Sequence, residues 1–145
     1  MEQNNLISFA NVKASLFDPE VLTLLAPSVY NPTPERLKHR AEEYTADSNV
    51  KAYACRNNEK YIGIVVFVTE NDTAEILDIA VKPEYRKHGI GRKLIDFIFN
   101  RFPVDTIIAE TDDEAVGFYK RYGFAVTPTK EVSDTRRYFC KLSAV

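Results

Sequence analysis

The sequence predicts an α/β (α+β) fold built on one mixed, mostly antiparallel sheet. Three apolar, β-branched stretches at 50–56, 60–69 and 74–81 follow one another across short polar turns, which is typical of antiparallel strands. An amphipathic helical stretch then precedes another apolar segment at 107–110. A helix between two strands favours a parallel pairing, so we expect 107–110 to lie beside 74–81 across a right-handed crossover.

The first third of the chain is expected to hold one short strand and two helices. Residues 6–10 are mostly apolar and favour the strand. Asp18-Pro19-Glu20 and Thr33-Pro34-Glu35 each combine a capping residue, a proline suited to the first helical turn and an acid that favours the helix dipole. These signals predict two helix starts with a loop at 26–32 between the helices.

Turn residues divide the predicted sheet into strands. Asn57-Asn58 tolerates positive φ and is expected to close a hairpin between 50–56 and 60–69. Gly63 interrupts the second of these strands and indicates a bulge. Asn71-Asp72 is expected to turn the chain into 74–81.

The last third is expected to hold a helix and a hairpin. Thr111 and Glu114 have capping-box spacing, so we predict a helix that begins at Thr111 and stops at Gly123, a C-terminal glycine cap. The strands 124–129 and 137–142 are expected to form a closing hairpin around a polar turn.

Size and composition predict a single domain over residues 1–145. A hydrophobic content of 45% is enough for one core. The longest apolar run, 61–68, is too short to span a bilayer, and residues 1–5 lack the basic start and apolar core of a signal peptide. We therefore expect a soluble, cytoplasmic protein with no membrane partner.

Charge favours a small ligand over nucleic acid. The net charge of −2 gives no overall basic field, so nucleic acid is not an expected partner. A local cluster of Arg86, Lys87, Arg92 and Lys93 is better matched to a small anion. The sequence allows a homodimer.

The cysteines and histidines show no spacing typical of a metal site. Cys55 and Cys140 lie in apolar, strand-like stretches, so we predict reduced core residues. His39 and His88 are isolated on polar stretches and are expected to be solvated. No metal is therefore expected.

The segment 86–92, with the sequence Arg-Lys-His-Gly-Ile-Gly-Arg, is expected to start a helix after the strand 74–81. Two glycines let the backbone approach a ligand closely, while free N–H groups and the positive end of the helix dipole favour an anion such as phosphate. The third glycine of the dinucleotide fingerprint is absent, and so is the Gly-Lys-Ser/Thr ending of nucleotide triphosphatases.

Two motifs resemble the GNAT superfamily of N-acetyltransferases. The first is Arg-x-x-Gly-x-Gly after a strand ending in Val-x-Pro-x-Tyr, and the second is Phe-Tyr-x-x-x-Gly-Phe at 118–124. The resemblance covers 61–139. It implies a three-layer fold with helices on both faces of the sheet and a splayed strand pair at the cofactor site. It also implies transfer of an acetyl group from acetyl-CoA to a primary amine of a small molecule or peptide.

By this resemblance, acetyl-CoA is the acetyl donor and lies along the end of 74–81 and the following helix start. The pyrophosphate would meet the helix start, and the pantetheine amides would pair with exposed strand backbone. The residues implied in cofactor binding are Ile79, Ala80, Val81, Arg86, Lys87, His88, Gly89, Ile90, Gly91, Arg92 and Tyr119. Asp112 stands where the family often has an asparagine that contacts the coenzyme, which leaves that contact open.

The resemblance also proposes catalytic residues. Tyr119 matches the general acid that protonates the leaving thiolate, although a tyrosine buried with a satisfied hydroxyl is the alternative. Glu75 matches the base of some members, with Glu110 or water as rivals. A free glutamate has a pKa of about 4.3, so either acid would need burial or a water relay to take a proton from an amine.

Asp78 is a lone acid inside an apolar strand. We expect it to be an ordinary solvent-facing carboxylate, because acids are normally exposed. The alternative is a place beside a bulge that breaks the ladder.

The acceptor is left open by the sequence. Val29, Tyr30 and Asn31 either contact it or form a packed surface loop. Acids at strand ends favour a cationic acceptor, and they are Glu70, Asp72, Glu75 and Glu110. A CoA-binding regulatory or interaction module without turnover is the alternative function, against which Tyr119 argues.

Overall fold

Seven strands form one mixed sheet in the computed structural model, which describes residues 6–129 and 136–144. The spatial order is β1-β2-β3-β4-β5-β7-β6. The strands are β1 Ile7–Asn11, β2 Val50–Asn57, β3 Lys60–Glu70, β4 Thr73–Val81, β5 Thr106–Asp112, β6 Ala125–Pro128 and β7 Arg137–Ser143. β4 and β5 are parallel and the other neighbouring pairs are antiparallel. The predicted sheet is confirmed.

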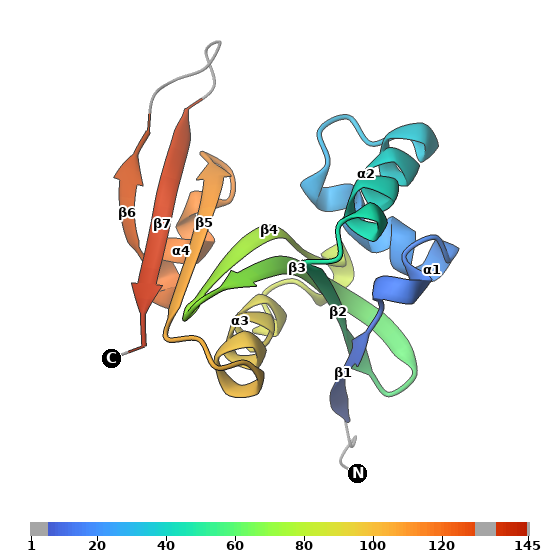
Figure 1. Cartoon of the computed structure of the whole chain (residues 1–145). Coiled ribbons are helices and arrows are strands. Elements are labelled where there is room, and N and C mark those ends of the chain that lie inside the picture. The colour runs from blue at the N-terminus through green and yellow to red at the C-terminus, as the bar shows by residue number, and fades with distance from the viewer. Residues whose placement is uncertain (1–5, 130–135, 145) are drawn as a thin grey trace.

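Helices cover both faces of this sheet, as predicted. The α-helices are α1 Pro19–Leu22, α2 Pro34–Ala46, α3 Ile90–Arg101 and α4 Val116–Tyr122. Short 3₁₀ helices lie at Lys13–Ser15, Thr23–Ser28 and Pro83–Tyr85. Figure 1 shows α1 and α2 on one side of the strands and α3 and α4 on the other. The result is a three-layer arrangement.

Each face has its own hydrophobic core, and β3 contributes to both. Val65 and Phe67 pack with α3 and α4, whereas Ile64 and Val66 pack with α1 and α2. Because successive strand side chains point to opposite faces, a strand covered on both sides is apolar throughout. This explains the long apolar run at 61–68.

Several local predictions are confirmed. Asn58 has φ of 59° and closes the β2–β3 hairpin. Cys55 pairs with Gly63 and Arg56 with Tyr61, so one extra residue bulges out beside Gly63. Cys55 and Cys140 are free and buried. No helix within the described ranges is long and apolar enough to cross a membrane.

The predicted start of the last helix is wrong. Thr111 is a buried residue of β5, and α4 begins only at Val116. Asp112 Oδ1 accepts hydrogen bonds from the backbone N–H groups of Glu114 and Ala115, at 3.0 and 3.1 Å. This Asx-type turn satisfies the N–H groups that a helix from Thr111 would have used.

The end of that helix and the closing hairpin lie where the sequence predicted them. Gly123, with φ of 124°, ends α4 as predicted. β6 and β7 pair antiparallel. The polar turn predicted between them falls largely on 130–135, outside the described residues.

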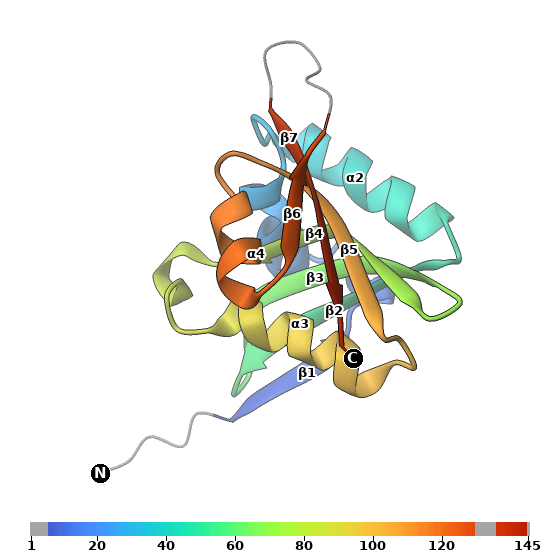
Figure 2. The same ribbon diagram turned by 90° about the vertical axis from the view of Figure 1, so that its left-hand side faces the viewer.

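β4 and β5 pair over only part of their length. Thr73 pairs with Thr106 and the ladder ends where Ile76 pairs with Ala109. Immediately after that point Leu77 is an extra residue in β4, because Val66 and Phe67 of β3 pair with Asp78 and Ile76. Figure 1 shows the two strands diverging from their common end, and in Figure 2 β6 and β7 run across β2 and β3, as in a strongly twisted sheet. The predicted splayed pair is confirmed.

Candidate active site

The start of α3 is open to an anionic ligand. Gly89 is the N-terminal cap with φ of 76°, and its carbonyl accepts the first helical hydrogen bond from Lys93 at 3.0 Å. The N–H groups of residues 90–92 therefore have no acceptor within the helix. A Cβ added to Gly89 would meet nothing within 4 Å, so space lies beside the backbone here. Such a helix start suits a phosphate.

Gly91 serves helix packing. A Cβ at this position would lie 2.8 Å from Cε1 of Phe118, on α4. The glycine therefore lets α3 and α4 approach closely. The sequence analysis had assigned both glycines to close contact with a ligand and did not predict this packing role for Gly91.

Cationic side chains surround the helix start. Arg86, Lys87 and His88 are exposed. Arg86 Nε donates to the Val81 carbonyl at 3.4 Å. Arg92 is tied to α4, because its guanidinium lies 4.4 Å from the centre of the Tyr122 ring. The loop thus combines free backbone donors with positive charge.

Lys87 holds a strained backbone conformation in this loop, with φ of 67°. A left-handed conformation costs a non-glycine residue about 1–2 kcal/mol. We expect Lys87→Gly to raise the free energy of unfolding by about 0.5–1 kcal/mol, because relief of strain exceeds the extra entropy lost by glycine. Urea denaturation measures this. Lys93→Gly, in the helix that follows, should instead destabilise by about 1 kcal/mol, and a loss of stability in both variants would contradict the expectation.

Beyond the pair Ile76–Ala109, β4 and β5 separate, and we call the space between them the splay. The edge of β4 that faces the splay carries backbone groups that β5 does not bind. Lys82 donates its N–H to Ile62 of β3 at 2.8 Å. Because backbone groups alternate sides along a strand, the N–H groups of Ile79 and Val81 point away from β3. Beyond Ile76 no β5 residue pairs with this edge. An extended ligand could add there as a strand does.

Tyr119 lies against the α3 side of the splay. Its side chain is 3% exposed and its ring packs edge-on against Phe118 and Phe124, at 5.2 and 5.1 Å between centres. In the described part of the chain, no group accepts a hydrogen bond from its hydroxyl. Burial, with smaller contributions from Cys140 and Asp78, raises the pKa of Tyr119 well above its ordinary value. The hydroxyl therefore stays protonated at neutral pH.

The two candidate bases lie on the other side of the sheet. Ala74 and Ile76 belong to the core under α3, so Glu75 between them faces the α2 side. Glu75 is exposed and pairs with Ile108, inside the closed part of the β4–β5 ladder. Glu110 is exposed and is the first β5 residue beyond that ladder.

The prediction that Asp78 faces solvent is wrong. Asp78 is 6% exposed and follows the bulge residue Leu77. Its Oδ2 accepts a hydrogen bond from Arg40 Nη1 at 2.8 Å and another from the hydroxyl of Tyr44. Burial of a carboxylate is tolerated because a cation and a hydroxyl from α2 compensate for the lost water.

Arg40 and Tyr44 were missed by the sequence analysis as members of the site. Two signals point to them in retrospect. Tyr44 lies on the apolar stripe of α2, where a buried hydroxyl needs a partner, and Arg40 lies one helical turn before it. Asp78 is the matching acid in an otherwise apolar strand.

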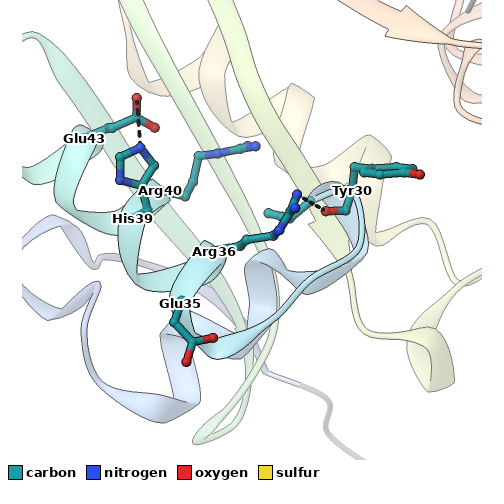
Figure 3. Close-up of a pocket in the computed structure, with 7 residues that line it drawn as sticks. Tyr30, Glu35, Arg36, His39, Arg40 and Glu43 are labelled. Carbon is teal, nitrogen blue, oxygen red and sulfur yellow. Dashed lines mark hydrogen bonds and ion pairs between the residues drawn. The ribbon is translucent and has the colours of Figure 1, made fainter.

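A cavity of about 330 Å³ lies between α2 and the loop before it. Its lining residues are Val29, Tyr30, Glu35, Arg36, His39, Arg40 and Glu43. Tyr30 is 87% exposed at the rim, and Arg36 donates to its carbonyl at 3.5 Å (Figure 3). His39 is exposed, as predicted, and lies 3.9 Å from Glu43. The predicted loop at 26–32 is shorter than expected, because a 3₁₀ helix extends to Ser28. The cavity reaches from Val29 and Tyr30, just after this helix, to Arg40, the partner of Asp78.

Comparisons with known proteins agree on one family and one fold. A family model for the acetyltransferase (GNAT) domain matches residues 48–126. The peptidyl-lysine N-acetyltransferase YjaB of Salmonella typhimurium strain LT2 is 30% identical over 93 residues, which make up 63% of this chain and 61% of that protein. This chain therefore matches less than two thirds of the length of that relative.

Solved structures share the fold at low sequence identity. An acetyltransferase from Thermus thermophilus superposes with a TM-score of 0.74 and 14% identity, covering 94% of this chain and 96% of that one. A GNAT family acetyltransferase from Elizabethkingia anophelis, with acetyl-CoA bound, superposes with a TM-score of 0.70 and 20% identity. The match covers 97% of this chain and 99% of that one.

Proposed function

Because this chain belongs to the GNAT family of acetyltransferases, we propose that it is an N-acetyltransferase that transfers the acetyl group of acetyl-CoA to a primary amine. The observation that carries the proposal is the opening between β4 and β5, which lies beside the free N-terminus of α3. A relative named as a peptidyl-lysine N-acetyltransferase and a structural neighbour with acetyl-CoA bound support it.

The donor would be held by backbone more than by side chains. The N–H groups at the start of α3 would bind the pyrophosphate, with Arg86 and Lys87 adding positive charge and His88 an exposed ring beside them. The pantetheine arm would pair with Ile79 and Val81 along the unpaired edge of β4. This arrangement would place the thioester in the splay, near Tyr119.

Starting from the neutral amine, the reaction needs one bond made, one bond broken and two protons moved. An acceptor that arrives as an ammonium ion must first lose one further proton, to water or to one of the candidate bases, because only the neutral amine has a lone pair for attack. The amine nitrogen attacks the thioester carbonyl carbon, the carbon–sulfur bond breaks, and the sulfur leaves as a thiolate. Tyr119 would give its hydroxyl proton to that sulfur, because the hydroxyl is a proton donor at the splay and no described residue accepts a hydrogen bond from it. The proton lost by the amine would pass to Glu75, to Glu110 or to water.

The role of Glu75 can be tested by substitution. If Glu75 takes the amine proton directly or through water, Glu75→Gln should lower the turnover of an amine of high pKa by about tenfold or more. It should also steepen the rise of rate with alkaline pH, because free amine must then form in bulk water. CoA affinity should stay the same. The pH–rate profiles of Glu75→Gln and Glu110→Gln measure this, and an unaltered profile for Glu75→Gln would leave Glu110 or water as the base.

The acceptor would be cationic before reaction. Exposed acids on the α2 side of the sheet, Glu75 and Glu110, favour an amine that arrives protonated, such as a lysine side chain. We also propose that residues 1–145 form one domain, that it works in the cytoplasm, and that no metal takes part.

Thiol release from acetyl-CoA across a library of primary amines tests the function. Amine-dependent release at a rate well above acetyl-CoA hydrolysis is the expected result. CoA binding without amine-dependent release would instead favour a regulatory module that has lost turnover.

A further inference from the structure

Asp78 lies where the sheet opens. It follows the bulge at Leu77, one step beyond the last β4–β5 pair at Ile76. Its side chain is on the α2 side, bonded to Arg40 and Tyr44, yet its charge helps to raise the pKa of Tyr119 on the α3 side. The carboxylate therefore lies at the point where β4 and β5 separate, on the α2 side of the sheet.

Only one of the two carboxylate oxygens of Asp78 accepts a hydrogen bond from the described residues. Both hydrogen bonds from α2 end on Oδ2, and no group in the ranges 6–129 and 136–144 donates to Oδ1. An ionised carboxylate can accept about four hydrogen bonds. Although the side chain is only 5% exposed, Oδ1 is not among the fully buried polar atoms that lack a partner in the described residues, so a small polar ligand can reach it.

Arg40 connects Asp78 to the cavity beside α2, although Asp78 itself does not line that cavity. Arg40, which holds Oδ2, also lines that cavity, and in Figure 3 it extends away from the neighbouring His39. Tyr30 marks the opposite rim. A molecule bound in this cavity would contact Arg40, the partner of Asp78.

We propose that Asp78 binds the acceptor amine, with Oδ1 accepting an N–H of the attacking nitrogen while Arg40 and Tyr44 fix the carboxylate. The inference rests on the proposed acetyltransferase function and narrows its substrate class. Because so little of Asp78 is exposed, a primary amine at the end of an unbranched chain, such as a lysine side chain, fits the site.

Asp78 is not the base in this scheme. Arg40 and Tyr44 both donate to its Oδ2, so the carboxylate is held as a hydrogen-bond acceptor that positions the amine, and the proton of the amine passes to another group. Loss of Asp78 should therefore weaken acceptor binding more than it slows the chemical step.

Asp78→Asn is the decisive variant. An asparagine of the same shape still offers one oxygen to Arg40 and Tyr44, but its NH₂ group cannot accept from an amine. With Nα-acetyl-lysine methylamide as the acceptor probe, we expect KM to rise by about tenfold or more and kcat to change by less than about threefold. CoA affinity by calorimetry should stay within about twofold. Glu42→Gln, an exposed acid on α2, is the charge-matched control and should leave KM unchanged.

Tyr44→Phe separates binding from a purely structural role. It removes one hydrogen bond to Oδ2 and leaves Oδ1 intact, so it should lower the melting temperature and raise KM much less than Asp78→Asn does. An equal rise of KM in both variants, following the loss of stability, would show that the cluster only anchors α2. Parental KM in folded Asp78→Asn would overturn this inference alone. A parent protein that releases no thiol with any primary amine would overturn the proposed function as well.

Discussion

Tyr119→Phe should lower kcat by at least about tenfold on an efficiently used amine, with little change in CoA affinity or melting temperature. The substitution removes one hydroxyl and almost no volume, so the edge-on packing against Phe118 and Phe124 survives. General acid catalysis contributes about a hundredfold to ten-thousandfold, and the lower bound allows for water as a substitute donor. No described residue accepts from this hydroxyl, so its removal should cost the fold little.

Tyr122→Phe is the matched control on the same helix. The Tyr122 hydroxyl donates to Asp96, whereas no residue within 6–129 and 136–144 accepts a hydrogen bond from the Tyr119 hydroxyl. This control should lose about 1 kcal/mol of stability and keep kcat within about twofold. If Tyr119→Phe also keeps kcat within about twofold, Tyr119 is a packing residue and the proton comes from elsewhere.

Gly89→Val should weaken CoA binding by at least about tenfold. Gly89 has φ of 76°, a region that β-branched residues rarely enter, and its side-chain direction points into open space beside the helix start. A valine would therefore both distort the loop and occupy the space that a phosphate would use. Loss of one charge-assisted hydrogen bond, at about 1.5–3 kcal/mol, corresponds to about tenfold or more in Kd.

Gly123→Val provides the control for backbone strain. Gly123 also has positive φ and open space around it, but it lies at the end of α4. Both valine variants should lose stability, and only Gly89→Val should lose CoA affinity in a calorimetric titration. Unchanged affinity in a folded Gly89→Val variant would place the phosphates elsewhere.

The segment from β4 to α3 could be predicted because its signals are local. Alternating apolar residues, a proline after the strand and glycine at the helix start all act within a few residues of one another. The start of α4 could not be predicted correctly, because a capping-box pattern and a turn-forming aspartate occur in the same four residues. Thr111 and Glu114 have capping-box spacing, but Asp112 forms the turn first.

The cluster around Asp78 could not be predicted from local sequence patterns, because its members are far apart in the chain. An acid in an apolar strand is usually exposed, and only a partner from a distant segment makes burial tolerable. For Asp78 those partners are Arg40 and Tyr44, which lie 38 and 34 residues earlier in the chain. The bulge at Leu77 likewise depends on the register with β3.

The proposal that the protein forms an amide from acetyl-CoA and a primary amine is tested most directly by following the acetyl group itself. Acetyl-CoA labelled with ¹³C at the acetyl carbonyl is incubated with the protein and Nα-acetyl-lysine methylamide, and carbon NMR follows the label. We predict that the thioester signal is replaced by an amide signal on the lysine side chain, and that Tyr119→Phe slows this exchange. Label that stays in the thioester, or appears only as free acetate, across the whole amine library would contradict the proposed N-acetyltransferase activity.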